Sequence, residues 1–134
     1  MNGAASSFEI VPVGVVESLL VDPVGAPRQA VEGAPSAWLA MSPAVADGIG
    51  GLAVGDRVTI LTWLHLARRD VLVTHPRDDS TRTERGVFGT RSQDRPNPIG
   101  LHPATITAID GLRVQVDQLE AVNGTPIIDL KCAL

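Results

Sequence analysis

The sequence predicts a mainly β protein, an antiparallel sandwich or small barrel with one short helix and long loops. Two observations indicate this fold class. Short apolar segments recur between turn signals made of glycine, proline and asparagine, and only one short segment has the features of a helix start. The chain has 134 residues, of which 44% are hydrophobic, so one domain with a sizeable core is expected.

The strand candidates are rich in β-branched residues, alternate apolar with polar residues, or, at 37–41, form a short apolar run. They are residues 8–18, 37–41, 57–66, 71–74, 102–109, 112–119 and 125–132. Segment 57–66 is the most apolar, and its β-branched content favours a buried strand, although periodicity alone does not exclude a helix. Asp110-Gly111 predicts a hairpin.

The helix signal is Ser42-Pro43, with serine at the cap position and proline in the first turn. The helix is expected to cover residues 44–47 and to stop at the glycines of segment 48–51. Residues 1–7 are expected to be a flexible leader, and residues 8–134 a single domain. Segments 19–33 and 75–85 read as loops.

A distinctive stretch, residues 86–101, begins like a strand at Val87-Phe88 and then carries arginines and the sequence Pro96-Asn97-Pro98. Proline fixes φ and lacks a backbone donor, so this part cannot lie inside a helix or a central strand. A stiff exposed loop that presents guanidinium and amide groups is expected. The alternative is a proline-rich turn with solvated arginines.

Charge and composition limit the possible functions. The formal net charge is −4 and aromatics make up 3%, which argues against a polyanion-attracting protein and against stacked aromatic platforms for nucleic acid. Any contact with nucleic acid would need a local basic patch. One span concentrates arginines: Arg68, Arg69, Arg77, Arg82, Arg85, Arg91 and Arg95.

Several other classes of site are not expected. The single cysteine, Cys132, excludes a disulfide framework within the chain and reads as a small buried residue. His65, His75 and His102 lack ligand spacing, so no metal is expected. Taken alone, His65 reads as a core histidine and His102 as a structural one. No membrane span or signal peptide is recognisable, so a cytoplasmic protein is expected.

Four motifs occur in a fixed order along the chain: PRQ at 27–29, TWLH at 62–65, GVFGTRS through RPNPIG at 86–100, and NGTPIIDLK at 123–131. Together they resemble the TrmO family, also called TsaA-like, over nearly all of residues 8–131. Members are tRNA adenine-N6 methyltransferases that use S-adenosylmethionine. The resemblance implies a small antiparallel β-barrel that works as a homodimer.

The resemblance also implies a cofactor site near the subunit interface. Carried over by motif, its residues are Pro27, Arg28, Gln29, His65, Leu66, Arg91, Leu101, Asp117, Gln118, Leu119 and Glu120. Arg85, Arg95 and Asn97 are weaker candidates for substrate contact, and tRNA is a possible partner. No catalytic residue is identified.

Two departures from the family pattern bear on the substrate. Asp56-Arg57 stands where members often have Ser-His, and Cys132-Ala133-Leu134 follows Lys131 where members usually continue with Pro-Tyr. The extra C-terminal domain of longer members is not expected here. Two alternatives to a tRNA methyltransferase therefore stay open: a methyltransferase for a small molecule or another nucleoside, and a non-catalytic module that binds S-adenosylmethionine.

Overall fold

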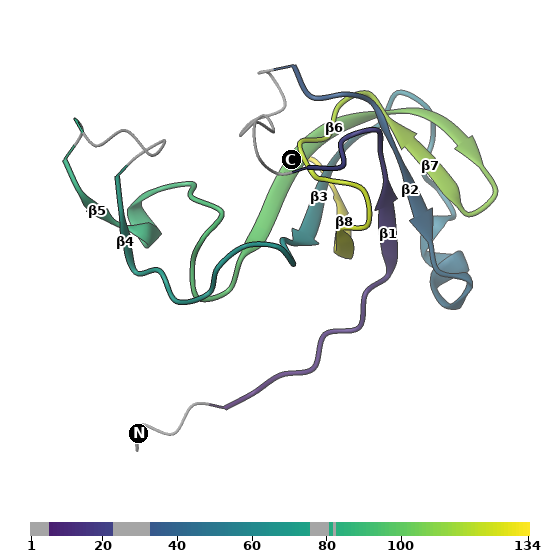
Figure 1. Cartoon of the computed structure of the whole chain (residues 1–134). Helices are drawn as coiled ribbons and strands as arrows, with labels where there is room; N and C mark the ends of the chain where they lie inside the picture. The colour runs from purple at the N-terminus through teal and green to yellow at the C-terminus, as the bar shows by residue number, and fades with distance from the viewer. Residues whose placement is uncertain (1–5, 23–32, 76–80, 82) are drawn as a thin grey trace.

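The computed structural model describes residues 6–22, 33–75, 81 and 83–134. Six antiparallel strands are hydrogen-bonded in the order β1-β2-β7-β6-β3-β8, and pairing of β1 with β8 closes them into a barrel (Figure 1). The strands are β1 (Gly14–Glu17), β2 (Ala37–Met41), β3 (Arg57–Trp63), β4 (Val73–Thr74), β5 (Arg85–Gly86), β6 (Ile99–Asp110), β7 (Arg113–Val116) and β8 (Pro126–Cys132). The predicted fold class is confirmed.

The barrel interior is filled by the inward-facing side chains of its strands. Alternate residues of β3 and β6 are buried, as expected when one face of a strand meets the core. The core cluster consists of Val16, Ala37, Leu39, Met41, Val58, Ile60, Ala104, Ile106, Val114, Val116, Leu119, Ala121 and Ile127. β6 is the longest strand and pairs with both β3 and β7, so it links the two halves of the barrel.

The predicted short helix is present as a 3₁₀ helix, η2 (Pro43–Ile49), and the Ser42 hydroxyl caps it by accepting a hydrogen bond from the Ala44 N–H at 3.3 Å. A second single turn, η4 (Val87–Gly89), was not expected. The prediction of a strand at Val87-Phe88 was wrong, because β5 ends at Gly86. The Thr90 N–H then donates to the Val87 carbonyl and closes a turn.

Several strand boundaries differ from the prediction. β3 ends at Trp63 and β7 at Val116, each three residues before the predicted end, and β4 covers only Val73–Thr74 of the predicted 71–74. Two further differences have clear reasons. β1 begins at Gly14, because residues 8–12 pair with no strand in the described part of the chain, and Phe8 is 87% exposed. β6 begins earlier than predicted, at Ile99, because Ile99 pairs with Trp63 at the end of β3. The last residues of the proline-rich stretch are therefore barrel strand rather than loop.

β4 and β5 pair as a small two-stranded hairpin that lies apart from the barrel (Figure 1). The chain leaves the barrel after β3, forms this hairpin and η4, and returns at the start of β6. We call residues 64–98 the arm. Among the described residues, no helix is long and apolar enough to cross a membrane.

Candidate functional site

Polar side chains replace apolar ones at the end of the barrel from which the arm emerges. Along β3 the inward positions run Val58, Ile60 and then Thr62, and Thr62 is fully buried. Along β6, His102 is the inward residue nearest this end that has a side chain, and it is only 3% exposed. A β-bulge between β3 and β8 lies at the same end, a common feature beside functional sites.

These buried groups form a hydrogen-bonded chain. Thr62 Oγ1 lies 2.7 Å from His102 Nε2, and His102 Nδ1 lies 2.7 Å from Glu120 Oε1. The pattern is satisfied by a neutral imidazole that donates from Nδ1 to the carboxylate and accepts from the Thr62 hydroxyl at Nε2. Thr62 has no exposed surface, and its hydroxyl is engaged by His102.

Glu120 is supplied by the segment that follows β7. This segment is fixed to the barrel by backbone contacts: Asp117 and Thr105 exchange two hydrogen bonds, and the Leu119 N–H donates to the Pro35 carbonyl at 2.9 Å. Glu120 Oε2 is buried and has no hydrogen-bond partner among the residues that the structure describes. A buried acceptor without a partner costs about 1–3 kcal/mol, so this atom calls for an explanation.

The structure brings several of the predicted cofactor residues to this end of the barrel. His65 and Leu66 follow β3 directly, Leu101 faces outward on β6 beside the inward-facing His102, and Glu120 joins the site through His102. The Leu119 side chain lies in the core, so only its backbone could contact a ligand. Asp117 is exposed and Gln118 half-buried. Pro27, Arg28 and Gln29 lie outside the described residues.

The burial of two predicted residues differs from expectation. His65 is exposed, so its interpretation as a core histidine was wrong, because β3 ends at Trp63 and His65 lies beyond the barrel. His102 is instead the buried histidine, only 3% exposed. Cys132 is exposed rather than buried, because it is the last residue of β8.

Arg95 organises the loop between η4 and β6. Its guanidinium donates to the carbonyls of Val87 at 2.8 Å, Ser92 at 2.8 Å and Thr90 at 3.2 Å. The backbone N–H of Arg95 donates to the Arg68 carbonyl on the other side of the arm. The prediction of a stiff loop is therefore supported by specific contacts, and the Arg95 guanidinium is used inside the protein.

Asn97 is also held within the arm. The Arg69 guanidinium donates to Asn97 Oδ1 at 3.0 Å and to the Pro96 carbonyl at 2.7 Å, and it lies 5.0 Å from the centre of the Trp63 ring. By contrast, Arg85 and Arg91 are exposed. Within the described part of the chain, neither guanidinium makes a hydrogen bond or an ion pair.

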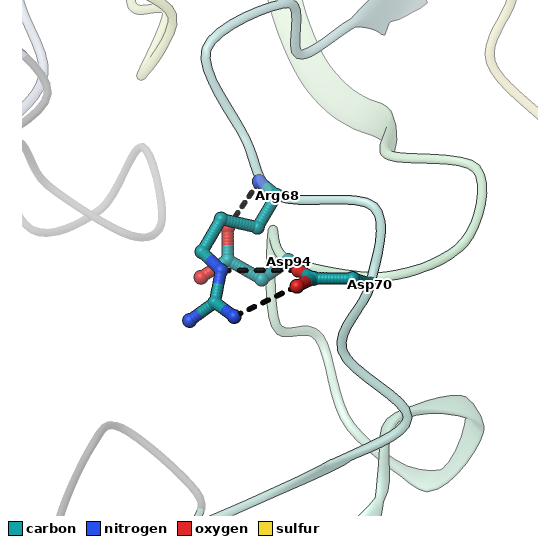
Figure 2. A network of polar contacts seen from close by, with 3 residues as sticks. All are labelled: Arg68, Asp70 and Asp94. Carbon is teal, nitrogen blue, oxygen red and sulfur yellow. Dashed lines mark hydrogen bonds and ion pairs between the residues drawn. The ribbon is translucent and has the colours of Figure 1, made fainter.

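A third set of polar contacts joins the two sides of the arm (Figure 2). Asp94 accepts a hydrogen bond from the Arg68 N–H at 2.8 Å, and the Arg68 guanidinium donates twice to Asp70. The hydrogen bond from Arg68 lowers the pKa of Asp70, and the same bond raises the pKa of Arg68. Both side chains are well exposed, so solvent screening leaves this ion pair a small part in stability.

An open groove of about 520 Å³ runs beside these residues. It is lined by Arg68, Asp70, Val71, Leu72, Val73, Thr74, His75, Glu84 and Asp94. Three carboxylates among its walls disfavour a phosphate there. Among the residues that the structure describes, no group of three or more His, Cys, Asp or Glu side chains is placed to hold a metal ion.

Sequence reasoning did not single out Thr62 or Gly100, and it assigned His102 only a structural role. The sequence does carry a signal for them. Alternate residues of a strand face the core, and near the ends of β3 and β6 these inward positions hold Thr62, Gly100 and His102 in place of large apolar side chains. Gly100 is buried opposite Thr62, and a Cβ there would collide with Thr62 Oγ1 and His102 Nε2. The missing side chain makes room for the hydrogen bond between them.

The chain is similar to several known proteins. An S-adenosyl-L-methionine-binding protein of Archaeoglobus fulgidus is 38% identical over 120 residues, which cover 90% of this chain and 85% of that protein. A probable S-adenosyl-L-methionine-binding protein of Methanothermobacter thermautotrophicus is 38% identical over 124 residues, covering 92% and 88%.

Solved structures agree in fold. The crystal structure of TrmO from Pseudomonas aeruginosa superimposes with a TM-score of 0.75 at 24% identity and covers 96% of this chain. This chain spans 57% of the length of that protein. The model of the tRNA-methyltransferase O N-terminal domain matches residues 15–133, which is nearly the whole chain. The chain therefore belongs to the family of the tRNA-methyltransferase O N-terminal domain.

Proposed function

We propose that this chain binds S-adenosylmethionine at the arm end of the barrel and transfers its methyl group to a nucleophile. The observation that carries this proposal is the placement of motif residues. Residues far apart in sequence, His65, Leu101 and Glu120, lie at one end of a barrel whose family and relatives are associated with this cofactor.

The chemistry of the described residues fits this cofactor. Arg91 offers an uncommitted guanidinium, suited to a carboxylate. Glu120 Oε2 offers an unfilled acceptor, suited to an ammonium or a ribose hydroxyl. Leu66 and Leu101, 58% and 48% exposed, offer apolar surface suited to an adenine ring. Arg28 and Gln29 are further candidates outside the described residues.

The cofactor would supply an already activated methyl group on its sulfonium, so the protein needs no covalent nucleophile. The part left to the protein is alignment of donor and acceptor and exclusion of water. The loop between η4 and β6, held by Arg95 and Arg69, provides fixed geometry beside the site.

We further propose N6 of a threonylcarbamoyl-modified adenosine beside the tRNA anticodon as the acceptor. The family supports this choice, and the exposed Arg85 and Arg91 offer contacts to phosphates. The acidic groove favours keeping a second candidate, a small molecule or another nucleoside.

Transfer of tritiated methyl from the cofactor distinguishes these acceptors. The substrates to compare are tRNA with and without the threonylcarbamoyl group and a panel of free nucleosides. We expect label in modified tRNA alone. Label in free nucleosides would support the second candidate, and cofactor binding without transfer to anything would indicate a non-catalytic binding module.

Replacing Arg91 with alanine should weaken binding of S-adenosylhomocysteine by about 10- to 100-fold, because a charge-assisted contact to the carboxylate is lost. Calorimetric titration measures the change. Arg57→Ala is the matched control, because Arg57 is an exposed arginine at the opposite end of β3. Equal affinities for wild type and Arg91→Ala would remove Arg91 from the site.

We also propose that the chain forms a homodimer through the arm and the start of β6. Large apolar side chains are exposed there: Leu66, Leu72, Val73, Phe88, Ile99 and Leu101. Phe88 is the most exposed of them, at 81%. Sedimentation equilibrium should give twice the chain mass, and Phe88→Ser should shift the equilibrium toward monomer. A monomer at all concentrations would contradict the proposal.

A further inference from the structure

The proposed function assigns a ligand contact to Glu120 but no role to Thr62 or to His102, to which Glu120 is hydrogen-bonded. We propose that Thr62 and His102 are positioning residues for the ligand. They hold the Glu120 carboxylate through Oε1 so that Oε2 accepts a hydrogen bond from an N–H or O–H group of the bound nucleoside cofactor. This inference rests on the proposed function, because it concerns the same site.

Burial is the first argument. Thr62 is fully buried, His102 is 3% exposed and the Glu120 side chain is 10% exposed. Polar groups in such places cost free energy even when paired, and a well-packed apolar set is often at least as stable. These hydrogen-bonded polar side chains at the edge of the core are therefore better explained by a role in binding than by fold stability.

The unfilled acceptor is the second argument. Glu120 Oε1 is satisfied by His102, whereas Oε2 is buried and unpartnered within the described part of the chain. Both oxygens of a carboxylate are acceptors, so Oε2 fits a hydroxyl or an ammonium and repels a carboxylate or phosphate. A donor on a ligand would remove the penalty of the unpaired atom.

Three separate elements of the fold contribute to the hydrogen-bonded residues. Thr62 comes from β3, His102 from β6 and Glu120 from the segment after β7. Gly100 leaves the space in which Thr62 and His102 meet. Both ring nitrogens of His102 are engaged, Nε2 by the Thr62 hydroxyl and Nδ1 by Glu120 Oε1, so the hydroxyl fixes the ring and the ring fixes the carboxylate.

A double-mutant cycle on affinity for S-adenosylhomocysteine, measured by calorimetry, tests the proposal. Thr62→Val keeps the shape but removes the hydroxyl, Thr62→Ser keeps the hydroxyl, and Glu120→Gln removes the charge. We expect Thr62→Val and Glu120→Gln each to weaken binding about ten-fold. Thr62→Ser should stay within about two-fold of wild type.

The decisive result is the coupling between the sites. If Thr62 acts through Glu120, Thr62→Val should have no further effect on affinity in the Glu120→Gln background. Independent, additive effects, or a Thr62→Val protein that binds as wild type does, would overturn the inference. Should Thr62→Val not fold, His102→Asn takes its place in the cycle with the same expectation, because asparagine is too short to bridge to Thr62.

The outcome for the wild type separates this inference from the proposed function. A wild-type protein that does not bind S-adenosylhomocysteine contradicts the proposed function, and this inference falls with it. A wild type that binds, with variants that show no coupling, contradicts the positioning role alone.

Discussion

Replacing Gly100 with alanine should lower the free energy of unfolding by about 1–3 kcal/mol and should also abolish tight cofactor binding. The new Cβ would occupy the space where Thr62 Oγ1 and His102 Nε2 meet. Either the core is overpacked or the two side chains turn away from each other, and then Glu120 loses its support. Urea unfolding and calorimetric titration measure the two effects.

Gly48→Ala is the matched control. Gly48 lies in η2, and a Cβ there would meet nothing within 4 Å. This variant should unfold and bind as the wild type does. A Gly100→Ala protein that keeps wild-type stability and affinity would show that the space between Thr62 and His102 is not required.

Replacing Arg95 with alanine should lower the free energy of unfolding by about 1.5–3 kcal/mol, because charge-assisted hydrogen bonds to three carbonyls are lost together. The loop between η4 and β6 should become sensitive to proteolysis. Arg95→Lys should rescue little, because an ammonium cannot reproduce the planar geometry of the guanidinium.

Arg91→Ala provides the contrast on the same loop. Its guanidinium makes no hydrogen bond or ion pair in the described part of the chain, so stability should not change. Limited proteolysis and urea unfolding compare the two variants. Equal stability of Arg95→Ala and wild type would mean that the arm is held by its other contacts, such as that of Asp94 with Arg68.

The fold could be read from the sequence where local rules and burial agree. The short apolar run 37–41 predicted β2 with its observed bounds, Asp110-Gly111 marked the hairpin between β6 and β7, and Ser42-Pro43 marked the start of η2. In each case the residues make the conformation favourable without help from distant parts of the chain.

Features that depend on distant partners could not be read in this way. β1 starts late because residues 8–12 find no partner strand, and β6 starts early because Ile99 finds Trp63. His65 was assigned to the core from its apolar neighbours, but β3 ends two residues before it. The number of paired residues is set by the barrel, not by local propensity.

The candidate site was predictable in part. The motifs located Leu101 and Glu120, and the structure adds Thr62 and His102, which connect β3 and β6 to Glu120. The side-chain contacts of Arg95 and Asn97 were not predictable. The local sequence around an arginine in a polar loop does not indicate whether its guanidinium binds a ligand or the backbone of the same loop. The folded structure separates Arg95, which is engaged, from Arg91, which is free among the described residues.

Calorimetric titration of the wild-type protein with S-adenosylmethionine and, separately, S-adenosylhomocysteine tests the central claim most directly. We expect saturable binding of both, because the two ligands share the carboxylate, the ammonium and the ribose hydroxyls that the site is proposed to hold. No binding of either ligand would mean that the motifs serve the architecture of the barrel and its arm, and it would contradict the proposed methyltransferase function.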